Sequence, residues 1–93
     1  MTNKYEVALI LSVANGEEAL NALKEKFNDL IAKNGTVENV DEWGKRRLAY
    51  LINDEAEGYY IFTTFTSEPS LPAELERIAG ITEGVLRIMV IRK

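Results

Sequence analysis

The chain has 93 residues, of which 46% are hydrophobic, and a formal net charge of −4 at pH 7. This length predicts one domain that spans residues 1–93 and buries a modest core. The sequence contains no cysteine and no histidine, which excludes disulfides, thiol chemistry and the commonest metal-binding and acid–base side chain. The acidic balance argues against a general polyanion-binding protein, so any nucleic-acid contact must be confined to a local cationic surface.

The N-terminal segment predicts a β-strand. Tyr5, Val7, Leu9 and Leu11 share one parity, and this two-residue period is typical of a strand. The apolar run is short and has no basic leader, so we do not expect it to be a signal peptide. No stretch approaches the roughly 20 apolar residues of a membrane span, and we expect no membrane association.

A helix is predicted from about residue 16 to residue 33. Asn15 and Glu18 have the spacing of a capping box at its start, and Asn34-Gly35 predicts a left-handed stop at its end. Between these signals, apolar side chains recur at helical spacing, namely at Leu20, Leu23, Phe27, Leu30 and Ile31.

The middle of the chain predicts a long β-hairpin. Residues 36–52 are rich in β-branched and aromatic side chains, and residues 59–66 resume the same pattern after a segment typical of a turn, residues 53–58. Because the first of these strands is long, we expect the hairpin to be a prominent feature of the fold.

The remainder of the chain predicts a short helix and a last strand. Ser67 to Pro72 breaks the strand pattern and can cap a helix that ends at Gly80, and residues 84–93 return to a strand. The order βαββαβ predicts an α+β fold of the ferredoxin-like type, with a four-stranded antiparallel sheet and two helices on one face. We expect the core between helices and sheet to contain Leu9, Leu23, Phe27, Leu30, Leu48, Leu75, Ile78 and Ile88.

Two helices can cover only one face of the sheet, and the other face should carry polar residues because it meets water. The sequence predicts that this uncovered face is instead rich in apolar residues. If the odd-numbered residues of the first strand face the helices, Ala8 and Ile10 face away, and the last strand sends Met89 and Ile91 to the same side. Such a face in a small domain favours a surface for a protein partner. The alternative is that bulges and strand ends leave only scattered apolar atoms, as in ordinary monomers. We favour the partner surface because the apolar excess recurs in three strands.

The sequence offers no convincing catalytic or metal-binding group. No serine or threonine lies in a nucleophile-elbow context, and the glycines are dispersed and form no phosphate-binding run. The adjacent carboxylates Asp41-Glu42 and Asp54-Glu55 would point to opposite faces of a strand or lie in a loop, and they lack the spacing of a calcium loop. We therefore expect no enzyme activity, metal, cofactor or small-molecule substrate.

Three consecutive cations, Lys45, Arg46 and Arg47, lie within the long hairpin of this acidic chain. On a regular strand, Lys45 and Arg47 share one face and Arg46 takes the other, unless Gly44 marks a bulge that resets the register. The cations are therefore expected to reach both sides of the hairpin.

Two interpretations of these cations remain open. In the first, the arginines form salt bridges with Asp41 and Glu42 and prevent an edge strand from pairing with another sheet. In the second, they pair with phosphates while Tyr50 or Trp43 stacks on a base. Composition alone favours the first interpretation.

Four segments resemble the family of bacterial ribosomal protein number six of the small subunit: "YEVALIL", "KNGTVENVDEWGKRRLAYLIND", "EGYY" and "ITEGVLRIMVIRK". The resemblance spans essentially the whole chain, and W-G-K-R-R-L-A-Y is its most specific motif. It implies a ferredoxin-like fold, a location in the cytoplasmic ribosome and no catalytic activity. It also implies binding to the central domain of 16S ribosomal RNA together with ribosomal protein number eighteen, as a heterodimer.

With this resemblance, we expect the RNA contact on one positive surface, where cations outnumber neighbouring anions. Its predicted residues are Lys45, Arg46, Arg47, Tyr50, Arg87 and Arg92. The alternative function is a ferredoxin-like small-molecule regulatory or oligomerisation domain, which the fold alone equally allows. That domain should self-associate through its own sheet, whereas a ribosomal protein should await a different, basic chain.

Overall fold

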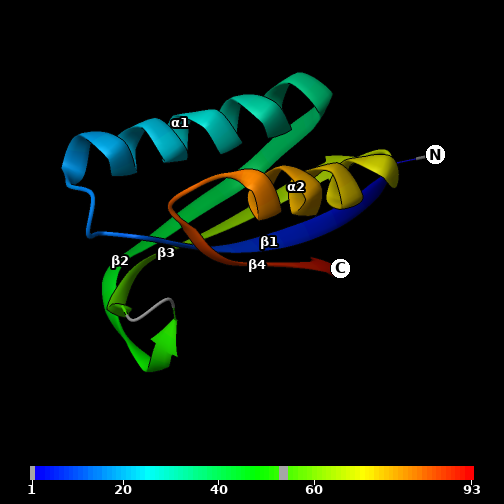
Figure 1. Ribbon diagram of the computed structural model, residues 1–93. Coiled ribbons are helices and arrows are strands. Elements are labelled where there is room, and N and C mark those ends of the chain that lie inside the picture. The colour runs from blue at the N-terminus through cyan, green and yellow to red at the C-terminus, as the bar shows by residue number, and fades with distance from the viewer. Residues whose placement is uncertain (1, 53–54) are drawn as a thin grey trace.

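The computed structural model describes residues 2–52 and 55–93 and contains a four-stranded sheet with two helices. Its elements are β1 (Asn3–Leu11), α1 (Glu17–Asn34), β2 (Gly35–Ile52), β3 (Glu55–Ser67), α2 (Ser70–Ile81) and β4 (Val85–Arg92). The strands pair antiparallel in the order β2-β3-β1-β4, and both helices cover one face of the sheet (Figure 1). The predicted ferredoxin-like α+β fold is confirmed. Among the described residues, no helix is long and apolar enough to cross a membrane.

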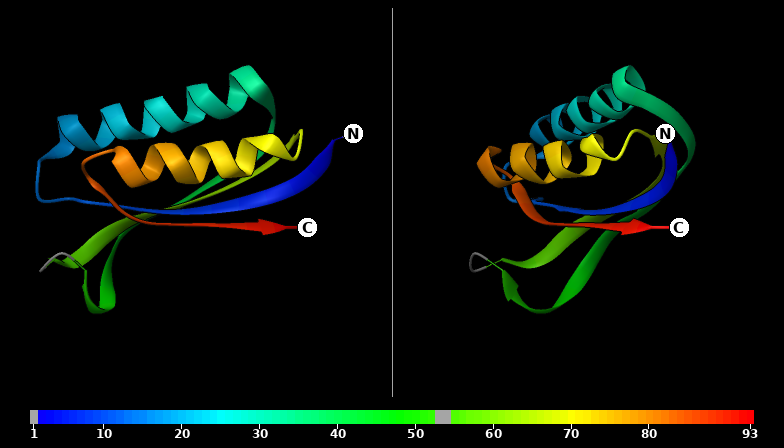
Figure 2. Two further views of the ribbon diagram at one scale, coloured as in Figure 1. Left: turned by 45° about the vertical axis from the view of Figure 1, so that its right-hand side comes forward. Right: turned by 90° about the vertical axis from the view of Figure 1, so that its right-hand side faces the viewer.

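The core fills the layer between the two helices and the sheet (Figure 2). Because successive strand residues point to opposite faces, β1 and β3 each direct one parity toward the helices. The buried cluster consists of Tyr5, Val7, Leu9, Leu11, Leu20, Phe27, Ile31, Ile61, Phe65, Leu71, Leu75 and Ala79. Four further residues predicted for the core pack against this cluster and are partly buried: Leu23, Leu30, Ile78 and Ile88.

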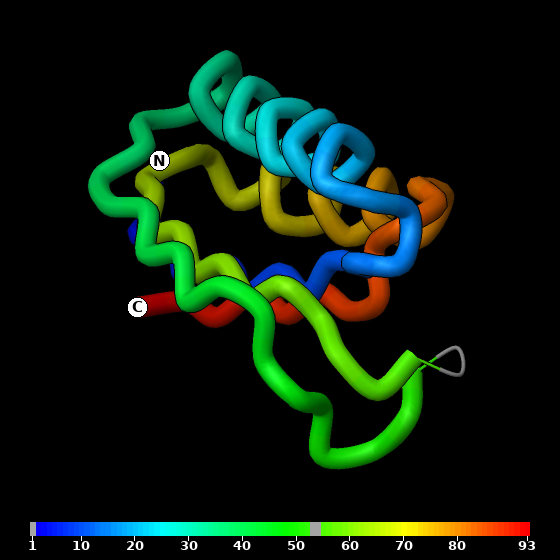
Figure 3. Tube along the Cα trace, turned by 90° about the vertical axis from the view of Figure 1, so that its left-hand side faces the viewer, coloured from blue at the N-terminus to red at the C-terminus, as the bar shows by residue number. Residues whose placement is uncertain are grey.

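The long hairpin bends away from the helices beyond the sheet (Figure 3). The register between β2 and β3 shifts between Glu42 and Gly44, and Gly44 has a φ of +82°, so this segment is a β-bulge. Residues 55–58, predicted as part of the turn, belong to β3, whereas Asn53 and Asp54 lie outside the described residues.

Leu48 is buried, but the prediction that it lies between helices and sheet is wrong. It lines a depression with Ile10 and Tyr60, which lie on the uncovered face. A Cβ added to Gly58 would lie 2.5 Å from Ile10 Cγ2 and 3.5 Å from Leu48 Cδ2, so glycine permits this close approach. The bend in the hairpin therefore forms a small second cluster on the uncovered face.

The ends of α1 differ from the signals predicted for them. The N-cap is Gly16, with a φ of +91°, and no side-chain hydrogen bond from the described chain caps this end, so the predicted Asn15–Glu18 capping box is wrong. The predicted left-handed stop is also wrong, because Gly35 has an extended φ of −168° and begins β2. A Cβ on Gly35 would lie 2.5 Å from the carbonyl oxygen of Thr66, so this glycine serves a close approach of two strands.

The ends of α2 also differ from the prediction. Ser67 is buried within β3 and donates from Oγ to the carbonyl oxygen of Glu68, while Pro69 precedes the helix without a side-chain cap from the described residues. The helix passes through Gly80 and ends at Ile81, because Gly80 lies on an open side of the helix and nothing there requires a stop.

Candidate partner face and cationic hairpin

The four residues predicted to meet a protein partner lie together on the uncovered face. Ala8 of β1 lies opposite Met89 of β4 and Phe62 of β3, with Ile10 and Ile91 in the adjacent rows. Residues opposite each other on antiparallel strands share a face, so these five side chains form one continuous apolar strip. They line a shallow depression of about 260 Å³, and Met89 and Ile91 are 43% and 49% exposed. We call Ala8, Ile10, Phe62, Met89 and Ile91 the apolar strip.

Trp43 extends the apolar strip onto β2. Its ring lies 4.6 Å from the ring of Phe62, centroid to centroid, and its Nε1 donates to Asp41 Oδ2 at 3.0 Å. Glu42 lies opposite the core residue Ile61, so the next residue, Trp43, points to the uncovered face, where it is 51% exposed. The sequence indicated Trp43 only as a base-stacking residue, because its contact with Phe62 depends on how β2 pairs with β3.

The three consecutive cations are exposed and lie just beyond the bulge. Lys45 lies opposite Tyr59, Arg46 opposite Gly58 and Arg47 opposite Glu57, so successive cations alternate between the faces of the hairpin, as predicted. The guanidinium carbon of Arg46 lies 5.8 Å from the centroid of the Trp43 ring, a cation–π contact.

The pairing predicted for these arginines is wrong. Among the described residues, neither Arg46 nor Arg47 forms an ion pair with Asp41 or Glu42. The reason is local: Asp41 accepts the hydrogen bond of Trp43, and Glu42 lies opposite the core residue Ile61 and so faces the helices. The arginine charges therefore remain open to an external anion.

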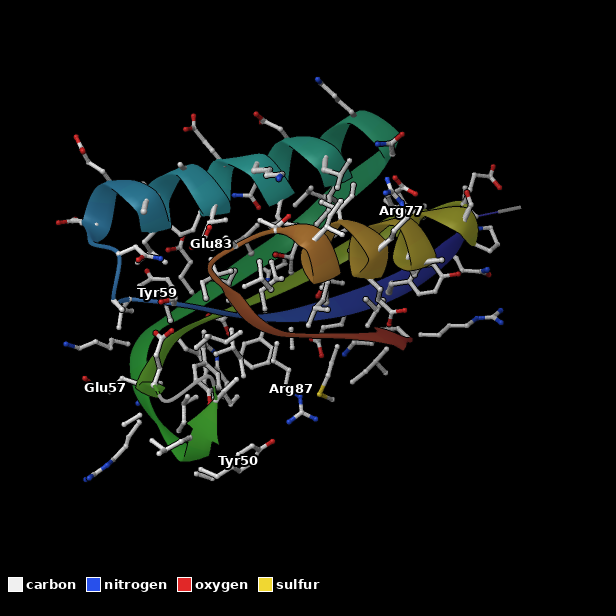
Figure 4. All side chains as sticks on the ribbon, viewed as in Figure 1. Tyr50, Glu57, Tyr59, Arg77, Glu83 and Arg87 are labelled. Carbon is white, nitrogen blue, oxygen red and sulfur yellow. The ribbon has the colours of Figure 1, made fainter. Side chains whose placement is uncertain are left out.

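The other predicted RNA-binding residues lie on two different sides of the sheet. Arg87 Nη1 donates to the phenol oxygen of Tyr50 at 2.7 Å, on the side of the sheet away from the helices (Figure 4). Arg92 lies opposite the core residue Tyr5, on the helix-facing side, and donates to Asn3 Oδ1 at 3.1 Å. Arg87 and Arg92 are five positions apart on one strand, and an odd separation places two side chains on opposite faces. The expectation of a single positive surface is wrong for Arg92.

Comparison with known proteins decides the family. The model of the family described as "Ribosomal protein S6" matches residues 4–92. The chain belongs to the ribosomal protein S6 family. Members of this family are ribosomal proteins of the small subunit, which places this S6-family chain in the cytoplasmic ribosome.

Individual relatives of this S6-family chain match over nearly its full length. It is 53% identical over 88 residues to small ribosomal subunit protein bS6 of Clostridium novyi, covering 94% of this chain and 93% of the relative. It is 50% identical over 90 residues to the bS6 protein of Alkaliphilus metalliredigens, covering 97% and 96%. A crystal structure of 30S ribosomal protein S6 from Thermotoga maritima has a TM-score of 0.91 at 26% identity, covering 100% of this chain and 89% of that one.

A three-residue cluster fixes the hairpin of this S6-family chain to α1, and sequence reasoning missed it. Glu42 Oε1 accepts hydrogen bonds from Tyr59 Oη at 2.7 Å and from Lys24 Nζ at 3.1 Å, and Lys24 Nζ lies 4.9 Å from the Tyr59 ring centroid. The hydrogen bonds from Tyr59 and then Lys24 lower the pKa of Glu42, and the hydrogen bond to Glu42 raises the pKa of Tyr59. Lys24 therefore faces the hairpin, and only 22% of its side chain is exposed.

The lowered pKa of Glu42 predicts a pH-dependent contribution to stability. Folding favours the charged carboxylate, so the contribution is present above the ordinary carboxyl pKa of 4.5 and is lost as the pH falls through the lower folded pKa. Because Glu42 is 43% exposed, solvent screening limits the contribution to below about 1 kcal/mol. Urea unfolding should show Glu42→Gln less stable than the parent near neutral pH, with the difference shrinking as the pH falls below the ordinary carboxyl pKa of 4.5.

Glu25→Gln, at an exposed position of α1, is the matched control for this measurement. A difference between Glu42→Gln and the parent that does not depend on pH, through and below the ordinary carboxyl pKa of 4.5, would show that the Glu42 charge does not act through this cluster.

The candidate surfaces contain binding groups rather than a catalytic or metal-binding arrangement. Within residues 2–52 and 55–93, no group of three or more carboxylates could hold a metal ion. The adjacent carboxylates Asp41 and Glu42 point to different faces, where each has its own hydrogen-bond donor. The site is an apolar strip with cationic side chains at its border, an arrangement that can bind another molecule.

Proposed function

We propose that this S6-family chain is a structural protein of the small ribosomal subunit that binds ribosomal protein number eighteen through its apolar strip. The heterodimer then binds the central domain of 16S ribosomal RNA. The chain acts as one domain spanning residues 1–93 and has no catalytic role. The observation that carries this proposal is the continuous apolar strip on the sheet face that the two helices leave uncovered.

The apolar strip is suited to a protein rather than to solvent. Met89 and Ile91 on β4 are about half exposed, and Trp43, at the β2 side of the same face, is 51% exposed, so a partner can remove substantial apolar area from water. Each square ångström of such area contributes roughly 25 cal/mol when it is buried. The net charge of −4 favours a basic chain as the partner, which agrees with the chemistry of an RNA-binding assembly.

The RNA contact is assigned to the cationic hairpin. Arg46 and Arg47 are exposed, and within the described part of the chain neither has a carboxylate partner. A cation without an internal partner can release counterions from a phosphate backbone. Trp43 beneath Arg46 adds an aromatic surface for a base or a guanidinium.

Replacing Arg46 and Arg47 by alanine should weaken binding of the heterodimer to a central-domain RNA fragment. The salt dependence should become shallower, by roughly one unit of slope for each phosphate that the heterodimer no longer neutralises. Filter binding between about 50 and 200 mM salt measures this slope. An unchanged slope would remove these arginines from the RNA contact and leave them only the protection of the edge strand.

Reconstitution with purified components tests the proposed function as a whole. The parent chain should form a one-to-one complex with ribosomal protein number eighteen, and the complex should bind the central-domain fragment. Sedimentation of the isolated chain is the control, since an oligomerisation domain would self-associate through its own sheet. Stable self-association, with no complex formed with ribosomal protein number eighteen, would contradict the proposal.

A further inference from the structure

Arg87 lies at one end of the apolar strip and, within the described part of the chain, has no carboxylate partner. It lies opposite Ile10 and lines the same depression as Met89. Its guanidinium donates one hydrogen bond, to the neutral phenol of Tyr50 at 2.7 Å (Figure 4). No carboxylate among the described residues lies within ion-pair distance of Arg87. An unneutralised cation therefore borders the strip.

The opposite end of the apolar strip is electrically balanced. Glu6 lies opposite Ile91, and Lys93 Nζ lies 3.6 Å from Glu6 Oε2. The depression is lined by two charged side chains, Glu6 and Arg87, and only Arg87 lacks an oppositely charged neighbour within the described chain. A partner that fills this depression therefore meets one charged side chain that no oppositely charged group of the described chain balances, namely Arg87.

Covering Arg87 without an anion would be unfavourable. A guanidinium removed from water carries a desolvation cost that an oppositely charged, hydrogen-bonded group offsets. The remaining donors of Arg87 form a fork that matches the two oxygens of a carboxylate. Because Tyr50 already holds the guanidinium at the edge of the strip, little side-chain freedom is lost when the pair forms.

The surroundings of Arg87 favour a carboxylate of a protein over a phosphate of RNA. Ile10 and Met89 make the adjoining wall of the depression apolar. A protein segment supplies apolar side chains and a carboxylate together, whereas a phosphate would have to leave water beside apolar groups.

We propose that the protein covering the apolar strip carries a carboxylate next to its apolar contact residues, and that this carboxylate pairs with Arg87. The inference rests on the proposed function and specifies the chemistry of that partner. It assigns Arg87 and Tyr50 to the partner face, although the sequence had placed both on the RNA-binding surface.

Binding of purified ribosomal protein number eighteen, measured by calorimetry without RNA, tests this pairing. Arg87→Gln should weaken binding by about 10- to 100-fold, because it removes the charge at the edge of a buried surface. Arg87→Lys retains the positive charge but not the forked guanidinium donors. Its affinity should lie between those of the parent and Arg87→Gln. Arg77→Gln is the matched control, since Arg77 is an exposed arginine on α2 whose partner is Glu74, and it should bind like the parent.

A charge reversal identifies the partner group directly. Arg87→Glu should abolish most binding, and one partner variant with a single carboxylate changed to arginine should restore it. Parent-like binding by Arg87→Gln, with weaker binding only when the RNA fragment is added, would overturn the proposal and assign Arg87 to a phosphate. If Met89→Asp abolishes binding while Arg87→Gln does not, the carboxylate pairing fails and the proposed function stands. If both bind like the parent, the partner face itself is wrong.

Discussion

Replacing Phe65 by alanine should lower the free energy of unfolding by about 3–5 kcal/mol. Phe65 is fully buried near the C-terminal end of β3, and its ring lies 5.7 Å from that of Tyr5, centroid to centroid. The truncation removes a large apolar side chain and leaves a cavity that the surrounding sheet and helices can only partly fill. Denaturant titration at constant temperature measures the change.

Ile81→Ala is the matched control for the core prediction. Ile81 is also apolar but lies 75% exposed at the end of α2, so its truncation should change the unfolding free energy by less than about 0.5 kcal/mol. Similar small effects at Phe65 and Ile81 would contradict the arrangement of the core.

Replacing Met89 by aspartate should leave the chain folded and weaken binding to ribosomal protein number eighteen by at least about 100-fold. Met89 is 43% exposed in the isolated chain, so water hydrates the new carboxylate there at little cost. The complex would have to bury that charge against an apolar partner surface, and this costs several kcal/mol. Calorimetric titration with the purified partner measures the change in affinity.

Ile81→Asp places the same substitution on the helix side and should bind like the parent. Ile10→Asp is less suitable than Met89→Asp, because Ile10 packs under the bend of the hairpin beside Leu48 and Gly58. Equal affinity of Met89→Asp and the parent would place the partner elsewhere on the molecule.

The order of elements and the two faces of the sheet were predictable from the sequence because they depend on local periodicity. The alternation of Tyr5, Val7, Leu9 and Leu11 determines which side of β1 enters the core. Ala8 has the opposite parity and therefore points to the uncovered face. Met89 points to the same face because it lies opposite Ala8 in the antiparallel pair of β1 and β4. The apolar strip follows from the same rule applied to three strands.

The features that sequence reasoning missed depend on departures from regular periodicity. The register between β2 and β3 shifts between Val37 and Asn39, so that Val37 and Glu42 both lie opposite core residues although their numbers differ in parity. Glu42 therefore faces α1, where Tyr59 and Lys24 bind it, and Trp43 points to the uncovered face. A two-residue period read through an uninterrupted strand cannot reveal that exchange of faces. A local signal exists only for the second register shift, at Gly44, because glycine readily adopts the positive φ that this bulge requires.

Long-range contacts explain the other misplaced residues. Leu48 and Ile10 line one depression and both lie close to Gly58, a contact between distant parts of the chain that no local pattern near Leu48 encodes. Arg92 is different, since counting five positions from Arg87 already predicts opposite faces. The prediction that Arg92 and Arg87 share one surface considered their positive charges and neglected the alternation of side chains along a strand.

The most direct test of the central claim is methyl NMR of the labelled chain during titration with unlabelled ribosomal protein number eighteen. We expect the methyl signals of Ala8, Met89 and Ile91 to shift or broaden as the complex forms, because these side chains become covered. The methyl signals of Ile81, on the helix side, should remain unchanged. Shifts confined to the helix side, with the apolar strip unaffected, would contradict the claim that the uncovered sheet face is the partner face.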